Sequence, residues 1–265
     1  MNTQKIIKHY EREDLYGDIL LELDRVGIAK DQITMNDLSK YDEMHIGRHE
    51  ATQRFAAKLP FTRNQNIIDI GAGLGGPARY IANKYACHIT GIDLTPQHVE
   101  TANKLSQLVS MATHTKFHIE DACALSFDTE SFDGGYTIHT GMNIKDKDAL
   151  YREIARILKP GSIFGIYEVF LTQPDSKIIY PLPWSSSADT SHLITIEALK
   201  TYMSDNNFEI VQEEDHKSSA LNALAALAPK IDPDKKPEFS KKIANLTDLI
   251  LKDRCKPYEI ICKKL

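Results

Sequence analysis

The chain lacks the long hydrophobic runs that would place it in a membrane or direct it out of the cell. No apolar run approaches the ~20 residues that a helix needs to span a bilayer. The first residues, MNTQKIIKHYERED, also lack the apolar core of a signal peptide. We therefore predict no membrane span and expect a cytoplasmic protein.

Cysteine and positive charge are scarce as well. The four cysteines lie at positions 87, 123, 255 and 262, without the paired spacing of a metal site, so we read them as free thiols and expect no bound metal. The 32 Lys and Arg residues are outnumbered by 37 Asp and Glu residues, which gives a net charge of −5. A chain without a basic excess offers no broad surface for nucleic acid, so we expect no such partner.

What the chain does have is a regular alternation of short apolar runs and amphipathic segments from residue 66 onward. Strands that alternate with helices favour a parallel sheet with right-handed crossovers. The predicted strands are 66–70, 88–93, 115–119, 132–138, 162–169, 208–216 and 258–263. The predicted helices are 50–59, 77–85, one that starts near Thr95-Pro96, 147–158, 195–206, 218–229 and 237–252.

Two regions depart from that alternation. Apolar residues recur at helical spacing over residues 1–25, including Ile6, Ile7 and Tyr10, so we expect residues 1–60 to form a helical cap on a core of residues 61–265. The segment 171–192 is rich in proline, serine and aromatics, and we predict a lid over about 171–206. The last two predicted helices carry a core-facing apolar stripe, and a homodimer through them stays open.

A glycine turn follows the first predicted strand. Residues 67–76 read IIDIGAGLGG, and Pro77 stands where the next helix begins. A turn of this kind places backbone N–H groups and the positive end of a helix dipole beside a pocket. Glycine lets a ligand approach closely, because a β-carbon would block it. Taken alone, the turn fits a dinucleotide as well as S-adenosylmethionine (SAM).

Acidic residues follow the next two predicted strands. Asp93 ends the second strand, at the edge of an open parallel sheet where ligands bind, and its carboxylate can accept both hydroxyls of a ribose. An acid after the third strand, in Glu120-Asp121-Ala122, can accept a hydrogen bond from an adenine amino group.

In this order and spacing, these segments, together with FDGGY at 132–136 and LKPG at 158–161, resemble the class I SAM-dependent methyltransferases. The resemblance covers about residues 50–170. It implies an α/β, Rossmann-like three-layer sandwich whose seven-stranded, mostly parallel sheet has the order 3-2-1-4-5-7-6, with an antiparallel last strand. It also implies SAM as cofactor and S-adenosylhomocysteine as its product.

Four further segments, 41–47, 75–79, 141–147 and 181–184, look like a small-molecule branch of that family. That branch includes the sarcosine/dimethylglycine and phosphoethanolamine methyltransferases and relatives that act on quinone and terpenoid-type acceptors. It implies a small-molecule acceptor, with an amine as the main expectation and a quinone, terpenoid or other lipid-like molecule as the alternative. Where the branch has Gly-Gly, this chain has Gly47-Arg48, which places an arginine near the pocket mouth.

The resemblance implies a role for each matching residue of the cofactor site. Gly71, Ala72 and Gly73 would wrap the amino-acid end of SAM, and Asp69 would orient this loop or the methionine ammonium group. The ribose would be held by Asp93, the adenine ring would lie against Leu94, and its edge would face Asp121 and Ala122. His139 would line the methyl-donor site and Tyr41 would close it.

A general base is needed when the acceptor atom carries a proton. His45, His49 and His139 are the candidates because histidine titrates near neutrality, and we favour His139 or His45. Tyr41 is the third residue that we expect to take part in catalysis. Aromatic faces attract cationic amines by about 0.5–2 kcal/mol each, and they also line apolar pockets. The predicted acceptor contacts are Tyr136, Tyr180, Trp184 and Arg48.

Two other readings stay open at this point. An NAD(P)-dependent oxidoreductase would use the same glycine turn, although the chain shows no evident Tyr-x-x-x-Lys catalytic pair of the short-chain dehydrogenase type: the spacing occurs at Tyr80 and Lys84, in the predicted helix directly after that turn. A SAM-binding protein without turnover would bind the cofactor and form no product. Methylation of RNA or protein is disfavoured, because Ile138-His139-Thr140-Gly141 stands where an Asn-Pro-Pro-Tyr motif would follow the fourth strand.

Overall fold

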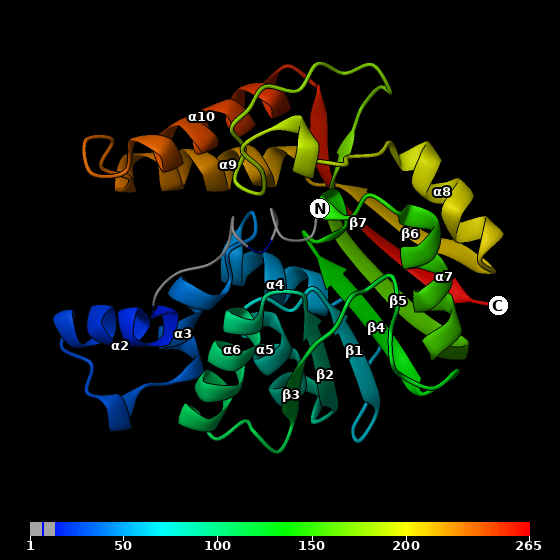
Figure 1. Ribbon diagram of the computed structural model, residues 1–265, viewed down its shortest axis with the longest axis horizontal. Coiled ribbons are helices and arrows are strands. Elements are labelled where there is room, and N and C mark those ends of the chain that lie inside the picture. The colour runs from blue at the N-terminus through cyan, green and yellow to red at the C-terminus, as the bar shows by residue number, and fades with distance from the viewer. Residues whose placement is uncertain (1–6, 8–13) are drawn as a thin grey trace.

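Seven strands form one sheet in the order β3-β2-β1-β4-β5-β7-β6 (Figure 1). The structure is a computed structural model that describes Ile7 and residues 14–265, so the predicted helical positions Ile6 and Tyr10 lie outside the described residues. Strands β1 to β5 pair in parallel, and β7 is antiparallel to both β5 and β6. The predicted sheet order is thus confirmed. The strands are β1 (Asn66–Ile70), β2 (His88–Asp93), β3 (Thr115–Ile119), β4 (Phe132–Ile138), β5 (Leu158–Leu171), β6 (Phe208–Asp215) and β7 (Cys255–Lys264).

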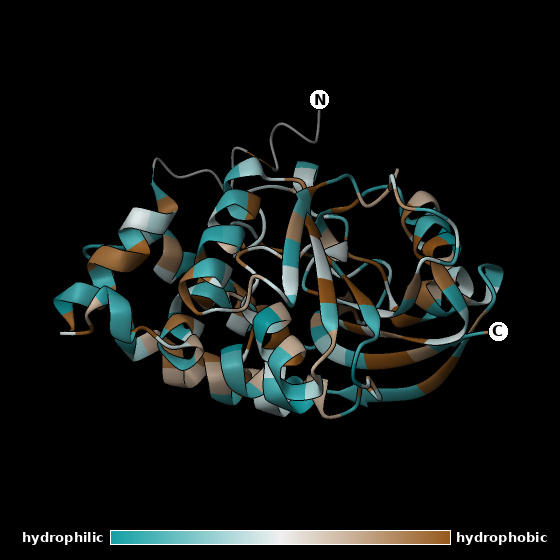
Figure 2. Cartoon of the chain, turned by 90° about the horizontal axis from the view of Figure 1, so that it is seen from below, coloured by the Kyte–Doolittle hydropathy of each residue, from teal (hydrophilic) through white to brown (hydrophobic). Residues whose placement is uncertain are grey.

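Helices cover both faces of this sheet. Ile67 packs with α4, α5 and α6, whereas its neighbour Ile68 packs with α7 and α8, because successive side chains of a strand point to opposite faces. Hydrophilic and hydrophobic residues lie side by side on the same helices (Figure 2), as burial of one helix face requires. The helices are α2 (Leu15–Arg25), α3 (Met35–Asp42), α4 (Arg48–Ala56), α5 (Gly76–Tyr85), α6 (Pro96–Leu108), α7 (Lys147–Ile157), α8 (Ile196–Asp205), α9 (Lys217–Leu227) and α10 (Pro237–Leu251), with short 3-10 turns η1 (Lys30–Gln32), η2 (Gly141–Asn143), η3 (Ala188–Thr190) and η4 (Ala228–Lys230). No described helix is long and apolar enough to cross a membrane.

Strand β5 differs from its prediction at its beginning. It starts at Leu158, which pairs with Phe132, and the register then shifts so that Ile163 pairs with Gly134. The LKPG segment therefore forms a bulge within the strand, with Gly161 at a φ of +79°. The extra residues lie at the end of the sheet opposite to the glycine turn.

The predicted lid segment, about 171–206, divides between two parts of the structure. Helix α8 packs on the sheet through Leu199 and Met203, so the residues from Ile196 onward belong to the core. Residues 172–195 instead pack with α9 and α10, which lie between β6 and β7 in the chain and above the sheet in Figure 1. The predicted apolar stripe on these two helices is buried here, through residues such as Leu224, Ile243 and Leu246. We call residues 172–195 together with α9 and α10 the upper cap.

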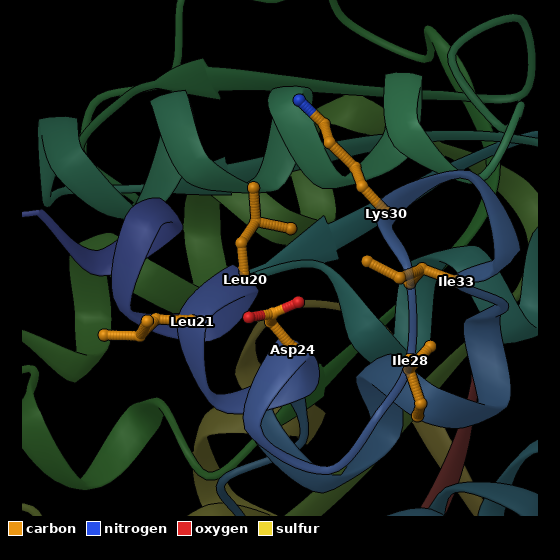
Figure 3. Close-up of a pocket in the computed structure, with 6 residues that line it drawn as sticks. All are labelled: Leu20, Leu21, Asp24, Ile28, Lys30 and Ile33. Carbon is orange, nitrogen blue, oxygen red and sulfur yellow. The ribbon is translucent and has the colours of Figure 1, made fainter.

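The N-terminal cap lies on the other side of the glycine turn. Helices α2 and α3 share a cluster with Leu74 of that turn and Leu105 of α6, through Ile19, Leu23 and Leu38. Next to it, a surface hollow of about 300 Å³ opens between α2 and η1 (Figure 3). None of the predicted site residues lines this hollow.

Candidate active site

The glycine turn after β1 has the backbone form that the sequence predicts. Gly71, Gly73 and Gly75 have φ values of +78°, +52° and +77°, a region that residues with a β-carbon rarely adopt. A β-carbon on Gly71 would lie 2.1 Å from Oγ1 of Thr140, whereas one on Gly73 would meet no atom within 4 Å. Gly71 is therefore needed for packing against the segment after β4, and Gly73 borders open space.

Asp93 is bound to this turn. Its Oδ2 accepts a hydrogen bond from the amide of Gly73 at 3.0 Å, and its Oδ1 accepts one from Thr95 at 2.8 Å. Burial alone would raise the pKa of Asp93, but the hydrogen bond and charge of His98 and the two amides outweigh it and lower the pKa. Asp93 thus stays ionised, and it has capacity left to accept further hydrogen bonds, as a ribose partner must.

Asp69 lies under the turn, on β1. It is 2% exposed, and its Oδ2 accepts a hydrogen bond of 2.9 Å from the hydroxyl of Tyr136 on β4. Burial is the main cause that raises the pKa of Asp69 to about 7, and the nearby charge of Asp93 acts in the same direction. A cationic ligand group above the turn would favour the charged form of this carboxyl.

Two of the candidate bases meet at the carboxyl end of β5. His139, which has a φ of +50°, follows β4 and lies edge-on to Tyr167, with ring centroids 4.6 Å apart. His45 comes from the N-terminal cap, and its ring centroid lies 6.1 Å from both His139 and Tyr167. The Tyr167 hydroxyl donates to the carbonyl of Ile46 at 2.9 Å, which ties β5 to the segment that carries His45.

These two histidines are held neutral. Burial is the main cause that lowers the pKa of His45 to about 4. Burial, with a smaller electrostatic contribution from His45, also lowers the pKa of His139 well below its usual value. Among the residues that the structure describes, Nε2 of His139 is buried and has no hydrogen-bond partner. A buried nitrogen without a partner can bind a ligand, and the place of His139 at the methyl-donor site stays a prediction.

A buried ion pair joins the cap to the turn. Arg79 of α5, 1% exposed, donates from Nη2 to Asp42 of α3 at 2.7 Å and to the carbonyl of Leu74 at 2.6 Å. Gly76 allows this contact, because a β-carbon there would lie 2.6 Å from both Asp42 and Glu43. The second Gly of the Gly75-Gly76 pair is thus required by packing between α3 and α5.

Sequence reasoning missed a second polar pair, Lys147 and Glu168. Both side chains are buried; Lys147 donates to the carbonyls of Gly141 and Ile144, and Glu168 accepts from the amides of Met142 and Val169. Burial raises the pKa of Glu168 to about 7 and lowers that of Lys147 to about 8. This pair fixes the segment after β4, next to His139. A charged residue in an apolar run such as 162–171 was the only signal in the sequence.

The predicted adenine contacts follow β2 and β3. Leu94 is half-buried directly after Asp93, and Ala122 packs on the edge of the core beside α7. Asp121 is exposed and accepts a hydrogen bond of 2.9 Å from the amide of Cys123, which fixes its carboxylate in a turn. Their placement beyond neighbouring strand ends fits the predicted role, which remains a prediction.

The predicted acceptor residues do not come together. Tyr136 is fully buried in the core under α4, Tyr41 packs in the N-terminal cluster, and Tyr180 and Trp184 pack in the upper cap. The indole N–H of Trp184 donates to Ser191 Oγ at 3.0 Å. Arg48, whose φ is +47°, donates to the carbonyl of Lys40. The four aromatic side chains, Tyr136, Tyr41, Tyr180 and Trp184, thus form no common cage.

One group of potential metal ligands lies beside Tyr167. Glu214, His216 and Glu259 bring three ligand atoms within 4.8 Å of one another. Two cations already neutralise these carboxylates: Arg54 donates to Glu259 at 2.9 Å, and Lys58 contacts both Glu259 and Glu214. A divalent ion there would have to displace Lys58 and face Arg54, so we assign no metal to this group.

Comparison with known proteins agrees with the geometry. A family model described as a methyltransferase domain matches residues 68–166. Sterol 24-C-methyltransferase erg-4 of Neurospora crassa is 31% identical over 175 residues, which cover 64% of this chain and 46% of that protein. 2-Methyl-6-phytyl-1,4-hydroquinone methyltransferase of Synechocystis sp. is 31% identical over 163 residues, 54% of this chain and 50% of that protein. The matches span about half the length of these relatives.

Solved structures share the fold. Geranyl diphosphate C-methyltransferase from Streptomyces coelicolor, in complex with S-adenosyl-L-homocysteine, has a TM-score of 0.75 at 14% identity and covers 100% of this chain and 98% of its own. Phosphoethanolamine N-methyltransferase 2 of Haemonchus contortus, in complex with S-adenosyl-L-methionine, has a TM-score of 0.73 at 20% identity, over 93% of this chain and 60% of its own. At these identities the likeness concerns the fold alone.

The sheet order, the glycine turn with Asp93 beyond β2, and the family match over residues 68–166 together show a methyltransferase domain of the class I SAM-dependent type. The residues present fit the cofactor, because Gly73 borders open space, Asp93 is ionised and oriented, and His139 offers an unpartnered nitrogen. For the methyl acceptor, the named relatives support the predicted alternative, a lipid-like molecule, better than the main expectation of an amine.

Proposed function

We propose that this protein transfers the methyl group of SAM to a carbon atom of a small apolar acceptor of the sterol, quinone or isoprenoid kind. The observation that carries this proposal is the dispersal of the predicted aromatic residues among three clusters, so that these side chains form no cage for a cationic amine in the described part of the chain. In its place, apolar side chains of the upper cap, Leu182 and Trp184, pack with Ile46, Met142 and Val169 near the strand ends. The names of the related sterol and hydroquinone methyltransferases support the same acceptor class.

The cofactor would be held by the turn and the two strand ends beside it. When bound, SAM supplies a methyl group on a positively charged sulfur, so that the reaction needs alignment and exclusion of water more than it needs activation. Asp93 would fix the ribose and Asp69 would face the ammonium end across the amides of Gly71 and Gly73. Positioning of two reactants can contribute up to ~7–11 kcal/mol to lowering a barrier.

Methylation of carbon releases a proton, so the site also needs a group that accepts one. His45 and His139 are neutral at pH 7 because burial lowers their pKa values, and they meet beside Tyr167. A weak base is sufficient when the proton leaves a carbocation, which is a strong acid. An apolar environment stabilises a carbocation poorly, which favours rapid transfer of the proton to a nearby imidazole.

A two-stage assay tests this function. Calorimetric titration with SAM, S-adenosylhomocysteine and NAD should give micromolar binding of the two sulfur compounds and none of NAD. Transfer of a labelled methyl group should then be measured to a sterol with a C24 double bond, 2-methyl-6-phytyl-1,4-hydroquinone and geranyl diphosphate, beside sarcosine and phosphoethanolamine. Turnover with an apolar acceptor supports the proposal. Turnover with the amines alone overturns it, and cofactor binding without any product supports a silent SAM-binding protein.

A further inference from the structure

A continuous set of hydrogen bonds runs through the N-terminal cap from the candidate base to the protein surface. Nε2 of His45 lies 3.1 Å from Oγ1 of Thr52, and the hydroxyl of Thr52 donates to Oε2 of Glu43. The other oxygen of Glu43, Oε1, lies 2.7 Å from Nδ1 of His49. Thr52 is 0% exposed and Glu43 2%, whereas the side chain of His49 is 28% exposed and its Nε2 reaches Gln53 at 3.1 Å.

The hydrogen bonds also fix which nitrogen of His45 carries the proton. Nε2 lies 3.0 Å from the carbonyl of Arg48, which can only accept, so Nε2 is the protonated nitrogen of the neutral ring. The hydroxyl of Thr52 uses its proton on Glu43 and offers its lone pairs to the same Nε2–H. No described residue hydrogen-bonds Nδ1, which leaves that nitrogen as a base for the acceptor.

We propose that His45, Thr52, Glu43 and His49 form a proton route that carries the proton released by the acceptor out of the closed site. The proposal rests on the proposed function, since it assumes an acceptor that loses a proton. In this reaction the acceptor's carbon–hydrogen bond breaks, its electron pair stays on the acceptor, and the proton goes to Nδ1 of His45. His45 passes its Nε2 proton to Thr52, and Thr52 passes its own to Oε2 of Glu43. Glu43 passes the proton on its Oε1 to the unprotonated Nδ1 of His49, and His49 gives its Nε2 proton to water. Each residue ends with the number of protons it had at the start.

The surroundings of Glu43 suit this role. The pKa of Glu43 is raised above its usual value, mainly by burial and also by the charge of Asp42. The hydrogen bonds from Thr52 and His49 and the charge of His49 partly offset this rise. A raised pKa makes the carboxyl group of Glu43 a better proton acceptor than an ordinary glutamate. Gly76 of α5 lies against Glu43, and Tyr80 of α5 lies edge-on to His49 at 5.1 Å. The helix that begins at the glycine turn therefore holds the route in place.

Among the described residues, His139 has no such hydrogen-bonded chain. Its Nε2 is buried without a partner there, and its backbone amide donates to the carbonyl of Tyr167. The ring of His45, which does begin such a chain, lies 6.1 Å away. The structure thus assigns different roles to the two candidate bases, with His45 at the inner end of the route.

The first test needs no knowledge of the acceptor. In protein labelled with ¹⁵N-histidine and saturated with S-adenosylhomocysteine, the exchange of the His45 Nε2 proton with water is measured by magnetisation transfer. Thr52→Val should slow this exchange at least tenfold, and Thr52→Ser should restore it. Ser39→Ala removes another buried hydroxyl, which bonds Asn36 in α3, and should leave exchange unchanged. Equal exchange rates in Thr52→Val and the unchanged protein would contradict the route.

The second test uses turnover with whichever acceptor the panel identifies. Thr52→Val and Glu43→Gln should lower kcat about tenfold with KM for SAM within twofold, and Thr52→Ser should recover kcat. Unfolding temperatures and calorimetric SAM titrations of each variant identify those that fail to fold. If Thr52→Val does not fold, the comparison uses Thr52→Ser and Glu43→Gln. Absence of turnover in the unchanged protein overturns the proposed function alone, because the exchange measurement still decides for or against the route.

Discussion

At the scale of single residues, the site depends on side chains and glycines that each have one structural task. Gly71 leaves room for the side chain of Thr140, and Gly73 borders open space. Asp93 accepts hydrogen bonds from the amides of Gly73 and Thr95. The first two tasks depend on the absence of a β-carbon and the third on a fixed negative charge. Substitutions at these positions should therefore have separate and measurable effects.

Gly71→Ala should lower the free energy of unfolding by about 2–5 kcal/mol, because left-handed strain of about 1–2 kcal/mol adds to overpacking of about 1–3 kcal/mol. It should also weaken SAM binding. Gly161→Ala is the matched control, since Gly161 has a φ of +79° with nothing within 4 Å and lies far from the turn. Urea unfolding and calorimetric SAM titration of both variants check this. Equal losses of stability would remove the role of Thr140.

Asp93→Asn should weaken SAM binding roughly tenfold to a hundredfold, since a hydrogen bond to a charged group contributes about 1.5–3 kcal/mol. Calorimetric titration measures the change in Kd. Asp133→Asn is the control, because Asp133 also accepts an amide, from Asn66 at 2.8 Å, but lies where β1 and β4 begin. If the two variants bind SAM equally well, Asp93 does not hold the ribose.

At the scale of elements, the candidate active site lies where the sheet meets the N-terminal cap and the upper cap. The Arg79–Asp42 pair joins α3 to α5, Lys147 and Glu168 hold the segment after β4, and Tyr167 holds the segment that carries His45. These contacts join residues far apart in the chain. The candidate bases are in place only when all three elements are docked.

Arg79→Met should destabilise the protein by about 3–5 kcal/mol, because it leaves the carboxylate of Asp42 buried without a countercharge. The double variant Asp42→Asn, Arg79→Met should recover a large part of that loss. Arg25→Met is the control: Arg25 pairs with Glu22 on the surface with a side chain 61% exposed, and its loss should cost about 0.5 kcal/mol or less. Urea unfolding measures all three, and a double variant no more stable than Arg79→Met would contradict this account.

At the scale of the whole molecule, buried carboxyls set how stability depends on pH. Burial raises the pKa of Asp69 to about 7 in the folded protein, from 3.8 in the unfolded chain. Between these two values the folded state binds more protons than the unfolded state, so the free energy of unfolding falls as the pH rises through this range. Glu168, whose pKa burial also raises to about 7, acts in the same direction.

Asp69→Asn should therefore become more stable relative to the unchanged protein as the pH rises from 4 to 8, since asparagine can still accept the Tyr136 hydroxyl without a charge. Asp37→Asn is the opposite control: its hydrogen bonds from Thr34 lower the pKa of Asp37, so its stabilising effect is present above about pH 4 and is lost as the pH falls below it. Unfolding curves at half-unit pH intervals check both slopes. A stability difference for Asp69→Asn that does not change with pH would overturn the assignment.

The sequence by itself determined the strands of the sheet and the glycine turn after the first of them. Both are local in the chain: each strand is a short apolar run, and the IIDIGAGLGG turn and Asp93 follow directly from strand ends. The order of the strands came from the family resemblance, and the structure confirms it. Periodicity and turn chemistry act over a few residues, so they can be read from one chain.

Only the tertiary structure decided what surrounds the acceptor. Tyr136, Tyr41 and Trp184 were predicted to share a site, but they pack in three separate clusters, because the direction of a side chain depends on which helix covers it. The upper cap combines residues 172–195 with helices that follow much later, and the His45–Thr52–Glu43–His49 route depends on how α4 meets the segment before it. Contacts of this kind follow from the docking of elements, which no local pattern of residues specifies.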